Sequence, residues 1–134
     1  MIKIQKKNFN VDREISSLKK KYNNVGAVSI FLGYVRDINK QKKVKSINLE
    51  VYPEMAEKFL SSICDNAKKK WDITDILIIH RFGKLKINEK IVLVATFSMH
   101  RKHGVNACNY IMDYLKKDAP FWKKEEYKNK TEWL

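Results

Sequence analysis

The chain has few residues that interrupt regular structure: its 134 residues include only four glycines and two prolines. This scarcity disfavours a fibrous or loop-rich protein. No apolar run is long enough to cross a membrane, and residues 1–7 lack the apolar stretch of a signal peptide. We therefore expect a cytoplasmic protein that folds as one domain over residues 1–134, because 44% hydrophobic residues suffice for a real core.

Acidic residues are also scarce, with 15 Asp and Glu against 28 Lys and Arg, so the formal net charge is +13. Such a charge attracts anions, whether nucleic acid, phosphorylated metabolites or an acidic protein. Most of the excess is lysine. A lysine bias of the whole proteome would give the same balance without any function, so the charge alone does not identify a partner.

The chain has only two cysteines, Cys64 and Cys108, and each falls in the apolar stripe of an expected helix. We interpret them as buried, reduced thiols, with a catalytic cysteine as the alternative. The sequence also lacks a P-loop, a dinucleotide-binding glycine motif, a paired metal-ligand motif and a nucleophile elbow. If the chain is an enzyme, we expect the nucleophile to come from the substrate or a partner, with no metal or cofactor.

Apolar residues recur with two periods, which define the expected elements. Helical spacing predicts helices at 11–22, 53–71 and 103–117. Alternating or continuous apolar patterns predict strands at 26–35, 46–52, 73–82 and 91–99, with short strands near 121–127 and 132–134. The strand at 26–35 is apolar on both faces and is expected to be central. Helices mixed with adjacent strands indicate an α+β domain rather than a doubly wound sheet.

The ends of the helices carry their usual signals. Asn10 is expected to cap the first helix, Pro53 suits the first turn of the second, and Pro120 stops the third. The second helix is expected to bury a stripe made of Met55, Phe59, Ile63, Ala67 and Trp71.

The segment Tyr114–Glu126 carries two lysine pairs, one on each side of an Ala-Pro and a Phe-Trp pair. The pKa of a lysine held against apolar rings beside other cations can be lowered, and such a lysine can bind an anion, carry a proton or be acylated. At about 100° per residue, Lys116 emerges beside the buried stripe of the last helix, whereas Lys117 faces solvent. The alternative for Lys116 is a side chain that only snorkels to water. If the segment is extended, Lys123 lies on the same side of the strand as Phe121.

Further cations stand at predicted strand ends, where backbone N–H groups and side chains often converge on anions. Arg36 ends the first predicted strand, and His100 and Arg101 follow the fourth. The alternatives are a loop-facing charge for Arg36 and a hydrogen-bonded structural histidine for His100. His80 lies inside an apolar strand, so we interpret it as a packing residue.

Six blocks of residues occur in an order that is typical of one family. They are Gly26 to Arg36, Leu49 to Met55, His80 to Gly83, Met99 to Arg101, Tyr110 to Lys116 and Ala119 to Lys123. From about residue 26 to residue 133, the chain closely resembles the catalytic (large) subunits of molybdopterin synthase. The resemblance implies an α/β hammerhead-type fold with a mixed or antiparallel sheet and additional short antiparallel strands.

The resemblance also implies an activity in molybdenum cofactor biosynthesis. In this family a small ubiquitin-like subunit carries a C-terminal glycine thiocarboxylate, and sulfur is transferred from it to cyclic pyranopterin monophosphate to form the dithiolene of molybdopterin. The implied partners are this sulfur carrier and a second large subunit, in a homodimer within a heterotetramer. The carrier's tail would pass Phe31 and Met112. The activity fits the missing nucleophile, because the sulfur arrives with the partner.

The resemblance assigns roles to the cations. Lys116 would lie by the thiocarboxylate tail and act in proton transfer or transient acyl contact, and Lys123 would position or activate the substrate. Arg36, His100 and Arg101 would line the anionic pocket for the pterin phosphate. Fixed cations in a partly dry pocket stabilise such anions far better than water-exposed ones.

Two alternatives stay open from the sequence. One is a basic nucleic-acid-binding module, whose affinity should fall steeply with salt. The other is a non-catalytic scaffold that only holds a ubiquitin-like partner. The spread of basic residues along the chain argues against the first, and the retained lysines and pocket cations argue against the second.

Overall fold

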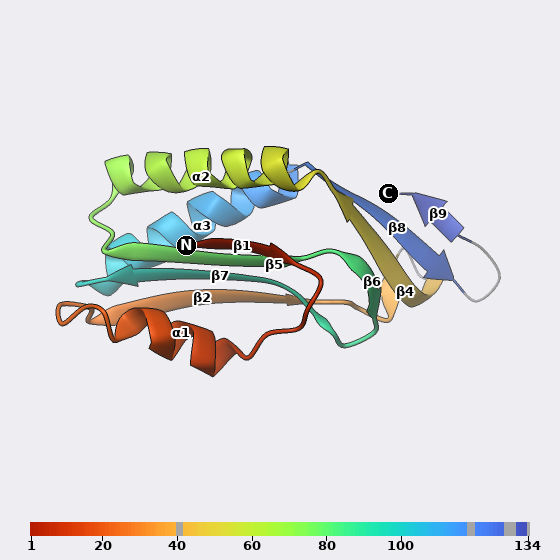
Figure 1. The fold of residues 1–134 in the computed structure, drawn as a ribbon, viewed down its shortest axis with the longest axis horizontal. Coiled ribbons are helices and arrows are strands. Elements are labelled where there is room, and N and C mark those ends of the chain that lie inside the picture. The colour runs from red at the N-terminus through yellow and green to blue at the C-terminus, as the bar shows by residue number, and fades with distance from the viewer. Residues whose placement is uncertain (40–41, 118–119, 128–130, 134) are drawn as a thin grey trace.

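A computed structural model describes residues 1–39, 42–117, 120–127 and 131–133, which form two sheets and three helices (Figure 1). The helices are α1 (Val11–Lys19), α2 (Pro53–Lys70) and α3 (Arg101–Lys117). Within these ranges, none of the helices is both long and apolar enough to cross a membrane. The predicted α+β class is confirmed.

The first sheet has the strand order β1-β5-β7-β2. Its strands are β1 (Ile2–Gln5), β5 (Asp75–Arg81), β7 (Lys90–Ser98) and β2 (Ala27–Tyr34). Strands β1 and β5 are parallel, whereas β5 with β7 and β7 with β2 are antiparallel. The sheet is therefore mixed, with β5 and β7 at its centre.

The second sheet continues from one end of the first (Figure 1). It contains β3 (Ile38–Asn39), β4 (Lys42–Val51), β8 (Phe121–Tyr127) and β9 (Thr131–Trp133) in that order, and β6 (Gly83–Lys86) also pairs with β4. All of these pairings are antiparallel, so the additional antiparallel strands implied by the resemblance are present.

Helices cover both faces of the first sheet (Figure 1). Helices α2 and α3 pack on one face, where Leu60, Ile63 and Ile111 meet Ile76 and Ile78 of β5. Helix α1 packs on the other face, where Leu18 belongs to the same buried cluster as Leu77, Leu93 and Phe97. Full burial of each such side chain contributes about 1.5–3 kcal/mol.

The end signals of two helices act as predicted. The side chain of Asn10 accepts a hydrogen bond from the backbone N–H of Arg13, and Pro53 occupies the first turn of α2. The predicted buried stripe of α2 is wrong at Met55, which is 57% exposed. The buried positions of α2 are Ala56, Leu60, Ile63, Cys64 and Ala67.

The prediction of a central strand at 26–35 is wrong, because β2 is the outermost strand of the first sheet. Its two faces are unequally covered. Phe31 packs against the core on the α2–α3 side, and Val28 and Leu32 pack on the α1 side. Ile30 and Tyr34 are 49% and 50% exposed. The apolar residues on both faces of β2 therefore reflect partial cover on each side rather than a central position.

Candidate functional site

The last turn of α3 and the ends of β2 and β5 lie beside the start of β7, at one end of the first sheet. Most of the candidate cations lie there. Helix α3 starts just after β7 and packs back along it (Figure 1). Its 17 residues span about 25 Å, close to the length of about 30 Å of the strand. The last turn of α3 therefore lies near the start of β7, as do the ends of β5 and β2. We call this region, with Lys116, Lys123 and Arg36, the cationic end.

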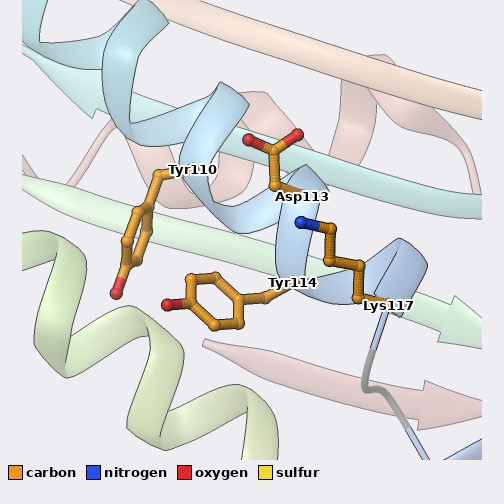
Figure 2. Close-up of a pocket in the computed structure, with 4 residues that line it drawn as sticks. All are labelled: Tyr110, Asp113, Tyr114 and Lys117. Atoms are coloured by element: carbon orange, nitrogen blue, oxygen red, sulfur yellow. The ribbon is translucent and has the colours of Figure 1, made fainter.

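Lys116 stands in the last turn of α3 and is exposed, as is Lys117. The two lysines differ in direction rather than in burial. Lys117 borders a groove of about 380 Å³ together with Tyr110, Asp113 and Tyr114 (Figure 2). Lys116 is about 100° away from Lys117 around the helix, so it projects to a different side. The predicted contrast, with Lys116 beside the buried stripe and Lys117 in solvent, is not seen in their burial, since both side chains are exposed.

Lys123 lies in β8 opposite Leu49 of β4 and is half-buried. Because β8 is extended here, Lys123 lies on the same side of the strand as Phe121, as the sequence predicted. Phe121 is stacked on His80 of β5, with ring centroids 3.7 Å apart and planes 18° apart. The start of β8 is thus attached directly to the end of the first sheet.

Arg36 follows Val35, which is buried at the end of β2. The backbone of Val35 is held on both sides: its N–H donates to the carbonyl of Glu89, and its carbonyl accepts from the N–H of Asn88, both at 3.0 Å. Val35 also belongs to the same buried cluster as Leu49, the strand partner of Lys123. Arg36 and Lys123 therefore emerge from neighbouring parts of the core.

His100 and Arg101 lie at the opposite end of the sheet. Both are exposed, and they follow Ser98, which pairs with Ala27 at the start of β2. From that pair to the pairing of Tyr34 with Lys90, the strands span about 25 Å. One copy of the chain therefore brings Lys116, Lys123 and Arg36 to one end and leaves His100 and Arg101 at the other.

The two residues predicted to line a tail channel lie on adjacent elements. Phe31 is on β2 and Met112 is on α3, and both are half-buried against the same core cluster. They form an apolar region between α3 and the outer strand. The passage of a partner's tail along it stays a prediction.

Arg81 has a role that the sequence reasoning missed. Its side chain is buried, and its guanidinium donates to the carbonyl of Lys6, twice at 3.1 Å, and to the carbonyl of Lys90 at 2.9 Å. A cation inside a strand of buried apolar residues needs such acceptors, and that is the sequence signal for its role. The predicted packing role of His80 is confirmed by its burial and its ring stacking.

Both cysteines are free and buried, as predicted. Burial raises the pKa of Cys64 to about 11 and also raises the pKa of Cys108. Both thiols are therefore protonated at neutral pH and are poor nucleophiles. In the part of the chain that the structure describes, no group of three or more His, Cys, Asp or Glu residues could hold a metal ion.

We expect both thiols to resist iodoacetamide at pH 7.5 in the folded protein, because thiolate is scarce and access is blocked. Mass spectrometry after timed labelling would measure this, with guanidinium-unfolded protein as the control that labels at both positions. Rapid labelling of Cys64 in the folded state would contradict the burial and reopen a reactive role for it.

Within the described residues, the chain is an α+β protein that brings Lys116, Lys123 and Arg36 to one end of its first sheet, and both of its cysteines are buried. The MoaE protein family model matches residues 4–118. The chain belongs to the MoaE family.

Comparisons with individual proteins agree. Over 133 residues the chain is 47% identical to a molybdopterin synthase catalytic subunit from Ralstonia nicotianae, and the aligned region covers 99% of this chain and 76% of that protein. The solved structure of molybdopterin synthase from Staphylococcus aureus superposes with a TM-score of 0.89 at 33% identity, covering 98% of this chain and 95% of that one. The predicted enzyme class, in molybdenum cofactor biosynthesis, is confirmed.

A more distant solved structure is a complex of subunits 1 and 2 of the molybdopterin-converting factor from Helicobacter pylori. It superposes with a TM-score of 0.83 at 18% identity, covering 99% of this chain and 89% of that one. At this identity the likeness concerns the fold alone.

Proposed function

We propose that this chain transfers sulfur from the C-terminal thiocarboxylate of a small ubiquitin-like subunit to cyclic pyranopterin monophosphate, as one cytoplasmic domain over residues 1–134. The observation that carries the proposal is that Lys116, Lys123 and Arg36 lie together at the cationic end. The chain also belongs to the MoaE family and is similar to molybdopterin synthase catalytic subunits. Both reactants are anions, and the site offers three cations on separate elements of a fixed core. A relative from Helicobacter pylori has been solved with its other subunit, which supports the choice of partner.

Each cation has a part in the reaction. The thiocarboxylate sulfur attacks a carbon of the pterin substrate, where a C–S bond forms as the C–O bond at that carbon breaks and its oxygen leaves with a proton. Water then attacks the tail carbonyl of the resulting thioester, so the C–S bond to the tail breaks, the sulfur stays on the substrate and the tail leaves as a carboxylate. Lys116 holds the tail's negative charge and exchanges a proton with it, while Lys123 orients the substrate and Arg36 binds its phosphate.

The remote position of His100 and Arg101 favours a shared pocket in a homodimer. Strand β2 is the outer strand of the first sheet, and Ile30 and Tyr34 leave apolar surface exposed along it. A second copy related by a two-fold axis across this strand would run antiparallel to it. That arrangement brings the partner subunit's His100 and the partner subunit's Arg101 toward Arg36.

Mixing two inactive variants tests the shared pocket. When Arg36→Ala and His100→Ala proteins exchange subunits, each mixed dimer regains one intact pocket, because that pocket takes Arg36 from one copy and His100 from the other. We expect roughly a quarter of wild-type activity in an equal mixture, since about half of the dimers are mixed and each has one working pocket. The measurement is dithiolene product formed with a thiocarboxylated small subunit.

The matched control mixes Arg36→Ala with Lys116→Ala. Both residues belong to the same end of the same copy, so no mixed dimer has an intact pocket and activity should stay absent. Recovery in this control, or no recovery in the first mixture after verified subunit exchange, would show that the pocket is not shared in this way. Full activity of each single variant would contradict the proposed function itself.

A further inference from the structure

We propose that the dipeptide His80-Arg81 at the end of β5 positions the cationic end: His80 holds Lys123 through Phe121, and Arg81 holds Arg36 through the Glu89–Lys90 turn. The inference rests on the proposed function for the roles of Lys123 and Arg36. Neither His80 nor Arg81 is placed among the groups that touch the reactants.

The two side chains point to opposite faces of the sheet, because successive residues of a strand alternate. His80 continues the row of Ile76 and Ile78 on the face that α2 and α3 cover. Arg81 points to the other side, where the carbonyl of Lys6 accepts from it. One dipeptide therefore reaches two separate parts of the cationic end.

On the first side, His80 is 8% exposed and fixed in its own orientation. Its Nδ1 lies 2.9 Å from the carbonyl oxygen of Arg81, which only accepts, so Nδ1 carries the proton. Burial lowers the pKa of His80 to about 4, so the ring is neutral at pH 7 and adds no charge beside the lysines. The flat ring of Phe121 stacks on it at 3.7 Å. Lys123 follows two residues later on the same side of β8.

On the second side, the guanidinium of Arg81 donates to the carbonyl of Lys90 at 2.9 Å and lies 3.9 Å from a carboxylate oxygen of Glu89. The backbone carbonyl of Glu89 in turn accepts a hydrogen bond from the backbone N–H of Val35 at 3.0 Å. Arg36 is the next residue. Arg81 is thus linked to Arg36 by the Glu89–Lys90 turn and by the backbone hydrogen bond between Glu89 and Val35.

A role in folding alone would not connect these two residues to the reaction. Both are polar groups in a strand whose residues 76–79 are all buried and apolar, and apolar residues would fill the strand without the need for specific acceptors. Instead, His80 contacts Phe121, two residues before Lys123, and Arg81 contacts the Glu89–Lys90 turn, which is hydrogen-bonded to Val35 next to Arg36. A misplacement of about 1 Å at such a cation is enough to cost up to roughly 100-fold in rate.

The test compares steady-state kinetics of variants with a thiocarboxylated small subunit and cyclic pyranopterin monophosphate. His80→Ala should lower kcat by roughly 10- to 100-fold with the small subunit still bound at full stoichiometry, and His80→Phe should restore most of the rate because it keeps the stacked ring. Arg81→Lys should instead raise the KM for the pterin substrate, as Arg36→Ala should. One ammonium group cannot reproduce the planar guanidinium that donates to the carbonyls of both Lys6 and Lys90.

Two further variants keep the test decisive. Ile78→Ala lies on the same strand and face as His80, so it should lower the melting temperature without the kcat or KM change. Glu89→Ala removes the carboxylate that lies 3.9 Å from Arg81 and accepts the backbone N–H of Lys86 at 2.6 Å, so it loosens the turn that holds Val35 and should raise the same KM even if Arg81→Lys does not fold. If the His80 variant with full binding and the Glu89 variant both behave like Ile78→Ala, the inference is wrong. Unchanged activity of Lys123→Ala and Arg36→Ala would instead refute the proposed function.

Discussion

Replacement of Lys116 by alanine should abolish sulfur transfer while the protein stays folded and still binds the small subunit. The ammonium group is exposed in the last turn of α3, so its loss removes no core packing. What is lost is the charge that holds the tail and exchanges its proton, and loss of such a group costs about 10²- to 10⁴-fold in rate. The measurement is dithiolene formation, with binding of the small subunit followed separately.

Lys117→Ala is the matched control, since it removes the same charge from the adjacent position of the same helical turn. Its side chain borders the groove of Tyr110 and Tyr114 instead (Figure 2), so turnover should be close to wild type. Equal losses in both variants would mean that only the local charge matters. Normal turnover by Lys116→Ala would remove Lys116 from the mechanism.

Replacement of Gly26 by alanine should have the largest effect on stability. A Cβ at this position would lie only 2.3 Å from the backbone carbonyl oxygen of Met99. The segments around Gly26 and Met99 cannot move apart freely, because the backbone N–H of Gly26 donates to the carbonyl of Ser98 at 2.9 Å. We expect a loss of about 3 kcal/mol in the free energy of unfolding, at the upper end for overpacking, measured by urea denaturation.

Gly33→Ala makes the same chemical change within β2, the strand that Gly26 directly precedes, and serves as the control. There the new Cβ would meet side-chain atoms, Val92 Cγ1 at 3.0 Å and Phe31 Cε2 at 3.3 Å, which have room to adjust. Gly33→Ala should therefore lose clearly less free energy of unfolding than Gly26→Ala. If Gly26→Ala were as stable as Gly33→Ala, the close approach of the backbone to Met99 would be refuted.

The sequence predicted the elements well where one local signal dominates. The described part of α3 runs to Lys117, and the polar cap of Asn10 and the position of Pro53 are local interactions that need no knowledge of the rest of the fold. The same holds for the sides on which Phe121 and Lys123 lie, because strand alternation depends only on the neighbouring residues.

Three features could not be read from local patterns. The outer position of β2 depends on which strands pair, and apolar residues on both faces fit an outer strand as well as a central one. The distance between Arg36 and His100 follows from the antiparallel register of β2 and β7, which links residues far apart in the sequence. The acceptors of Arg81 are backbone carbonyls, and their positions leave no trace in residue types.

The strand order also has a consequence for how the protein is made. The outer strands β1 and β2 lie in about the first quarter of the chain, but their partners β5 and β7 are synthesised roughly half a chain later. On the ribosome, neither outer strand can reach its native partner until that later segment has emerged. The start of β8, which carries Lys123, comes later still. The cationic end is therefore completed only when almost the whole chain is available, and a product truncated before β8 would have the strands of the first sheet, Arg36 and Lys116 but would lack Lys123.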